Sequence, residues 1–105
     1  MGKTDGDGCQ GVGGNAFDVA SGNLSAVATW SDPEATLKVE VWTVGFGRRL
    51  TVGTPSGGQR CSSASTTSDG NKIVVRVCHT AESRVPLAVR NDPTTFTRYH
   101  LVIGQ

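Results

Sequence analysis

The sequence has no long apolar run and almost no net charge. Its 105 residues are 36% hydrophobic and carry a formal net charge of +1. No apolar run approaches the roughly 20 residues that a membrane span needs. A charge so close to zero gives no electrostatic reason to expect a nucleic acid or an anionic membrane as partner. The length predicts one domain, so we expect a single domain without a membrane span.

The usual motifs of catalysis and cofactor binding are also missing. Gly-x-Ser-x-Gly, the nucleophile turn of many serine hydrolases, does not occur. His79 and His100 are the only histidines, and both fall on predicted strands. Cys78 and His79 are neighbours on one strand, where successive side chains point to opposite faces. They therefore pair poorly as nucleophile and base or as metal ligands. The sequence predicts a protein that is not an enzyme and needs no cofactor.

Alternation between apolar and polar residues is the main feature that is present. Leu37, Val39 and Val41 alternate with Lys38 and Glu40, which predicts a strand with one buried face. The same pattern predicts strands over Leu24–Trp30, Arg60–Thr66, Lys72–His79 and Phe96–Ile103, and shorter ones over Asn15–Ala20, Leu50–Val52 and Leu87–Arg90. Turn residues separate these runs, and none has an apolar stripe at helical spacing. We predict an all-β fold, an antiparallel, jelly-roll-like β-sandwich of seven to eight short strands over residues 15–105, with little or no helix. Residues 1–14, rich in glycine and aspartate, are expected to be a flexible leader or linker.

Three cysteines allow at most one internal disulfide, and none belongs to a Cys-x-x-Cys motif. Asp69-Gly70 is a strong turn signal between two predicted strands. A hairpin centred there places Cys61 opposite residues 76–78, within disulfide range. We therefore predict a Cys61–Cys78 disulfide, with Cys9 free or paired outside the domain. The alternative is three unlinked thiols in a reducing compartment.

Two groups of residues are candidates for ligand binding. Trp42 shares a strand face with Lys38 and Glu40, so its ring is expected to point outward, with Phe46 and Arg48 nearby. An outward tryptophan can stack on sugar rings or on an apolar partner; the alternative is that it packs under a neighbouring loop. The loop residues Asp32, Glu34 and Asp69 could bind calcium if their loops converge, the alternative being solvated turn residues.

The order of these features resembles bacterial pre-peptidase C-terminal domains, which are β-sandwiches appended to secreted peptidases. The resemblance rests on a strand ending in Trp30, a turn at Asp32-Pro33, an alternating strand to Trp42, the Gly turn before Ile73–Val77, and the closing Tyr99-His100-Leu101. It covers about 80 residues. The family's third strand is usually richer in aspartate, and Thr36 and Lys38 hold those places here, which weakens the inference of calcium binding.

That resemblance implies a noncatalytic accessory domain of a secreted or cell-surface protein, some of whose relatives bind polysaccharide or collagen. We expect the partner to be a polysaccharide or a protein. The residues after Met1 lack the apolar segment of a signal peptide, so an export leader is expected to have been removed ahead of them. The alternative is a free-standing structural or assembly protein that uses an exposed sheet edge.

Overall fold

The computed structural model describes residues 9–11, 16–55, 58–86, 88 and 98–105. Seven strands and one 3-10 turn are assigned in this part of the chain. In chain order the elements are β1 (Cys9–Gly11), β2 (Ser21–Thr29), β3 (Leu37–Thr43), η1 (Val44–Phe46), β4 (Arg49–Gly53), β5 (Cys61–Asp69), β6 (Ile73–His79) and β7 (His100–Gly104). The predicted all-β class is therefore confirmed.

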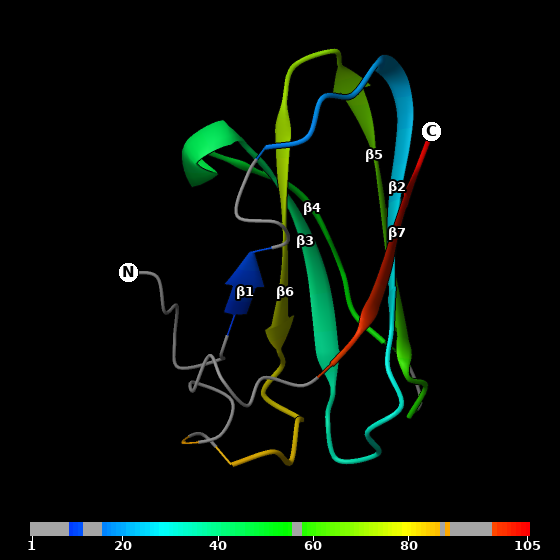
Figure 1. The fold of residues 1–105 in the computed structure, drawn as a ribbon, viewed down its shortest axis with the longest axis vertical. Coiled ribbons are helices and arrows are strands. Elements are labelled where there is room, and N and C mark those ends of the chain that lie inside the picture. Colours follow the sequence, from blue (N-terminus) through cyan, green and yellow to red (C-terminus); the bar gives the residue numbers. More distant parts are fainter. Residues whose placement is uncertain (1–8, 12–15, 56–57, 87, 89–97) are drawn as a thin grey trace.

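The strands form two sheets that face each other (Figure 1). One sheet has the order β1-β6-β3-β4 and the other has the order β5-β2-β7, and every pairing is antiparallel. The core between them is built from the inward side chains of the strands together with three residues of the connections: Leu24, Ala26, Ala28, Trp30, Ala35, Leu37, Val39, Val41, Ala64, Ile73, Val75, Val77 and Val85. The arrangement is that of a sandwich. Among the described residues, no helix is long and apolar enough to cross a membrane.

Strand β3 follows its sequence pattern closely. Leu37, Val39 and Val41 are buried between the sheets, because alternate side chains of a strand share one face. Trp30 lies in the core as predicted, and its indole Nε1 donates a hydrogen bond to the carbonyl oxygen of Ala35 at 2.9 Å. The indole thus fixes the start of the segment that leads into β3.

Several predicted boundaries differ from the structure. Residues 16–20 form no strand; Phe17 makes only an isolated bridge to Ile73. Cys9–Gly11, predicted to be part of a flexible leader, is a strand paired with β6. The rest of that leader lies outside the described residues, as does most of the predicted strand Leu87–Arg90.

The turn at Asp69–Gly70 exists, but it does not close a hairpin. Gly70 has φ of 92°, a conformation that glycine adopts without strain. The turn carries the chain from β5 in one sheet to β6 in the other, and β5 pairs with β2 instead. Cys61 therefore lies opposite Thr29, and its thiol is free. The predicted Cys61–Cys78 disulfide is wrong, because the two residues belong to different sheets.

Strands β4 and β5, which belong to different sheets, approach each other closely at Gly53. A Cβ atom added to Gly53 would lie 2.1 Å from the carbonyl oxygen of Ser63. Only glycine lets the two backbones come this close. Because β4 also ends here, the following connection begins at the same end of the sandwich as the β2–β3 connection.

Candidate functional site

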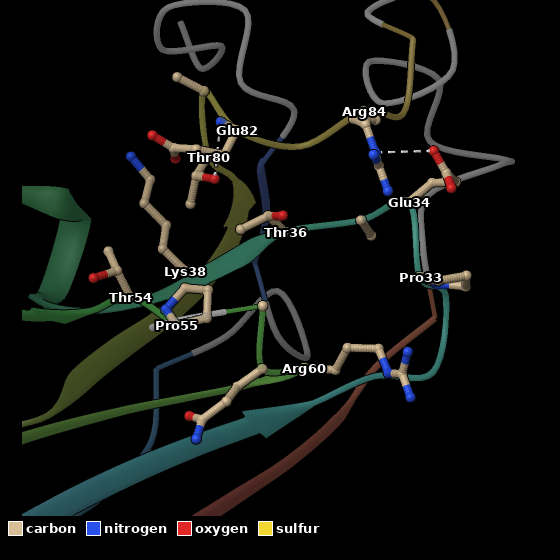
Figure 2. Close-up of a pocket in the computed structure, with 14 residues that line it drawn as sticks. Pro33, Glu34, Thr36, Lys38, Thr54, Pro55, Arg60, Thr80, Glu82 and Arg84 are labelled. Carbon is tan, nitrogen blue, oxygen red and sulfur yellow. Dashed lines mark hydrogen bonds and ion pairs between the residues drawn. The ribbon is translucent and has the colours of Figure 1, made fainter.

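Three connections between strands enclose a cleft at one end of the sandwich (Figure 2). Its volume is about 950 Å³, at the upper end of the usual range for ligand sites. The walls come from the β2–β3 connection, from the β4–β5 connection and from the segment that follows β6. The lining residues are Pro33, Glu34, Ala35, Thr36, Lys38, Thr54, Pro55, Gly58, Gln59, Arg60, Thr80, Ala81, Glu82 and Arg84. No aromatic ring stands among these residues, so the walls offer hydrogen bonds and charge rather than stacking.

Local hydrogen bonds shape the wall formed by the β2–β3 connection. The Oδ1 atom of Asp32 accepts a hydrogen bond from the backbone N–H of Glu34 at 2.9 Å, which is the local turn that aspartate favours. Glu34 then meets Arg84 twice. Its carbonyl oxygen accepts from the backbone N–H of Arg84 at 2.8 Å, and its Oε1 atom lies 3.2 Å from Nε of the same arginine. Two walls of the cleft are therefore joined at this point.

A buried polar pair supports the segment that follows β6. His79 is fully buried, and its Nδ1 atom lies 2.8 Å from the Oγ atom of Ser83. The Ser83 hydroxyl also lies 3.5 Å from the carbonyl oxygen of Glu34. The backbone N–H of Thr80 donates to the carbonyl oxygen of Thr36 at 2.8 Å. Because both side chains of the serine–histidine pair are buried, we assign the pair to holding the cleft wall in place.

The cleft carries more positive than negative side chains. Lys38, Arg60 and Arg84 line it together with Glu34 and Glu82. Figure 2 shows the Glu34–Arg84 ion pair on one side of the hollow, and Lys38, Thr80 and Glu82 on the other. Arg60 is exposed, and the described residues offer it no ion pair. Its guanidinium group is available to an anionic group on a ligand.

A separate charged cluster lies on the outer face of the four-stranded sheet. Glu40 is 2% exposed and accepts hydrogen bonds at Oε1 from Trp42 Nε1 (2.9 Å) and from Arg76 Nε (2.9 Å). Its Oε2 atom lies 3.4 Å from Arg49 Nη1 and 3.5 Å from Lys38 Nζ. Burial alone raises the pKa of Glu40, but the hydrogen bonds from Trp42 and Arg76 and the positive charges of Arg76 and Lys38 outweigh it, and the net pKa is lowered.

The predicted aromatic surface differs from a free stacking platform. Trp42 does lie on the outward face, as predicted, but it is half-buried, and the Arg76 guanidinium carbon stands 5.1 Å from the centre of its ring. One face of the ring is therefore occupied by a cation. Arg48 is exposed beside the η1 turn, and its backbone N–H donates to Thr43 Oγ1 at 2.8 Å. The side chain of Phe46 lies outside the described part of the structure.

The three acidic residues proposed for calcium are not brought together. Asp69 pairs with Ser21 at one end of β2, whereas Asp32 and Glu34 follow Thr29 at the other end. Nearly the whole length of β2 separates them. Among the described residues, no three His, Cys, Asp or Glu side chains gather closely enough to hold a metal ion.

Sequence reasoning missed the cleft and the buried polar groups around it. Arg60 and Glu82 stand in different loops, and nothing in their spacing indicates that the loops converge. The position of His79 carried a usable signal: it continues the alternation of Val75 and Val77, so it had to face the core and find a polar partner there. No known protein family, curated protein or solved structure matches this chain.

Proposed function

We propose that this chain is a noncatalytic binding domain of an exported protein, and that its ligand occupies the cleft at the loop end of the sandwich. The observation that carries the proposal is the lining of the cleft, where three basic side chains and several hydroxyl groups outnumber two carboxylates. Loops that a rigid sandwich holds in place are the usual carriers of binding in such folds. Most successive strands lie in opposite sheets, with the β3–β4 pair as the exception, and this supports a jelly-roll-like description of the same domain.

The chemistry of the lining favours an acidic polysaccharide as the ligand. Thr36, Thr54, Thr80 and Gln59 offer hydrogen bonds suited to sugar hydroxyls, and Arg60 offers a charge suited to a uronic acid carboxylate. A peptide partner usually needs deep pockets for apolar anchor side chains, and the apolar members of this lining are only alanine and proline. Because the described lining residues include no aromatic ring, we expect binding that depends strongly on salt.

The test measures binding of a soluble polyuronate to the purified chain by isothermal titration calorimetry. Arg60→Ala should abolish binding, because the exposed guanidinium is the group in the cleft best placed to meet a carboxylate. Arg48→Ala is the matched control: it removes the same charge from an exposed arginine at the far end of β3, and it should leave binding unchanged.

Three outcomes are informative. Loss of binding in Arg60→Ala alone supports the cleft. Loss in Arg48→Ala alone moves the site to the surface of Trp42, Phe46 and Arg48. If the wild-type chain binds neither the polyuronate nor a neutral polysaccharide, and if sizing shows a defined oligomer, the domain is an assembly protein and the proposal fails. Raising the ionic strength from about 0.01 M to about 1 M shortens the Debye length from about 30 Å to about 3 Å, and this should weaken genuine binding in the cleft.

A further inference from the structure

We propose that Cys9 and Cys78 form a disulfide bond that ties the edge strand β1 to β6. The two residues are direct partners in the antiparallel register of these strands, followed by the pairs Gln10–Val77 and Gly11–Arg76. The Cα atoms of directly opposed residues in antiparallel strands lie about 4.5–5.5 Å apart. Disulfides need Cα atoms about 4.4–6.8 Å apart. The backbone therefore places this pair of cysteines at the spacing that the bond requires.

The third cysteine is excluded by its position. Cys61 is free and lies on β5, where it faces outward from the three-stranded sheet opposite Thr29. Cys78 is fully buried and pairs with Lys38 in the four-stranded sheet. Both sheets and the core separate the two residues, so a bond between Cys61 and Cys78 would require the sandwich to open.

The position of the bond suggests a structural role. Strand β1 has three residues and pairs only with β6 in the described sheet, so few backbone hydrogen bonds hold it. Arg76, the next outward residue along β6, is the main partner of Glu40. A link at Cys78 therefore fixes the edge of the sheet beside the charged cluster. Because Cys78 has no exposed surface, a reductant in bulk solvent would reach it slowly in the folded chain.

The chemistry is thiol–disulfide exchange with a small-molecule disulfide, such as oxidised glutathione, as the two-electron oxidant. One cysteine loses its proton, and its thiolate attacks the glutathione disulfide, forming a mixed disulfide and releasing one glutathione thiolate. The thiolate of the second cysteine then attacks the protein sulfur of that mixed disulfide. The protein S–S bond forms, and the second glutathione thiolate leaves. The two released thiolates take up the two protons given up by the cysteines.

The experiment is thiol counting on the whole chain after refolding with oxidised glutathione. The protein is denatured without reductant, alkylated and measured by mass spectrometry. We expect one alkyl group per chain, at Cys61, and three after reduction. The matched control Cys61→Ser should accept no alkyl group without reductant. Cys9→Ser removes the proposed partner and leaves the buried Cys78 in place, and it should accept two.

Tryptic mapping identifies the partners. The three cysteines fall in separate peptides, Thr4–Lys38, Cys61–Lys72 and Val77–Arg84. We expect the first and the third to be joined in the oxidised protein. Three alkyl groups on the oxidised wild-type chain, or a cross-linked peptide that contains Cys61, would overturn the proposal. The outcome is independent of the polyuronate assay, so either proposal can fail alone.

Discussion

The sharpest test of the energetics is the removal of the Glu40 carboxylate. Glu40 is almost fully buried on the outer sheet face, and Arg76, its principal partner, is only 12% exposed. Arg76 approaches Oε1 through Nε at 2.9 Å and through Nη2 at 2.8 Å. Trp42 bonds the same oxygen. Glu40→Ala removes the acceptor of all these bonds and leaves their donors without it.

The expected loss follows from the degree of burial. Removing one partner of a buried ion pair costs about 3–5 kcal/mol. Since Arg76 keeps some contact with solvent, we expect Glu40→Ala to lower the free energy of unfolding by about 3 kcal/mol, the lower end of this range. Arg49 is 47% exposed, and its pair with Glu40 should contribute less than about 1 kcal/mol. Glu40→Gln keeps an oxygen acceptor for Trp42 but loses the charge, so we expect it to lower the free energy of unfolding by about 2 kcal/mol.

The pH dependence of stability gives the same prediction an independent readout. The pKa of Glu40 is lowered in the folded state from its ordinary value of 4.5. A lowered folded pKa means that the unfolded chain binds the proton more tightly. The stabilisation by Glu40 is therefore complete above pH 4.5 and is lost as the pH falls through the folded pKa. In Glu40→Gln this part of the acid destabilisation should disappear.

Urea denaturation followed by tryptophan fluorescence measures the loss. With a denaturant slope of about 1.5 kcal/mol/M, typical of a small domain, a loss of 3 kcal/mol lowers the midpoint by about 2 M. Arg49→Ala serves as the control that changes charge in the same cluster at an exposed position. A loss below about 1 kcal/mol in Glu40→Ala would show that the cluster behaves like an exposed ion pair, and it would refute the reasoning.

Two further predictions concern backbone packing and the high pH range. Gly53→Ala places a Cβ atom 2.1 Å from the carbonyl oxygen of Ser63, and because the backbone must move, we expect the free energy of unfolding in urea to fall by about 3 kcal/mol or more. The exposed control Val52→Ala should lower it by less than about 1 kcal/mol, and equal losses in the two variants would contradict the close approach. Burial raises the pKa of Tyr99 above 10.0, so the contribution of the protonated Tyr99 to the stability of the fold should be complete below pH 10 and decline as the pH rises through the folded pKa. An ultraviolet titration of the tyrosine with a midpoint at or below pH 10 would contradict this.

The sequence predicted single strands well and their partners poorly. Alternation fixed the buried face of β3, and it placed Trp30 inside and Trp42 on the outer face, because a strand has only two faces. The same reasoning failed at Asp69–Gly70. A turn signal predicts that the chain reverses, but it does not say whether the next strand continues the same sheet or crosses to the facing one. The error in sheet assignment produced the error about Cys61.

The candidate site was harder to predict for a related reason. Its lining comes from three connections that are distant in the sequence, and no local pattern links Arg60 to Glu82 or to Lys38. The calcium hypothesis shows the same limit, since Asp69 and Glu34 look alike in sequence and lie at opposite ends of β2. Residues in loops are placed by the topology of the strands, and that topology depends on pairings between distant segments.

The topology also separates the part of the molecule that stabilises it from the part proposed to bind. Glu40 and Arg76 lie in the middle of paired strands, where both backbones are fixed by hydrogen bonds on either side. The cleft lies beyond the strand ends, where its shape depends on a few contacts such as Glu34–Arg84 and His79–Ser83. Among the described residues, Lys38 alone belongs to both, because it lines the cleft and lies 3.5 Å from Glu40. An anion in the cleft would compete with Glu40 for that ammonium group. Since Arg76 supplies the shortest contact to the carboxylate, at 2.8 Å, and a hydrogen bond at 2.9 Å, the competition would cost the cluster little, and a ligand in the proposed site would leave the sheet intact.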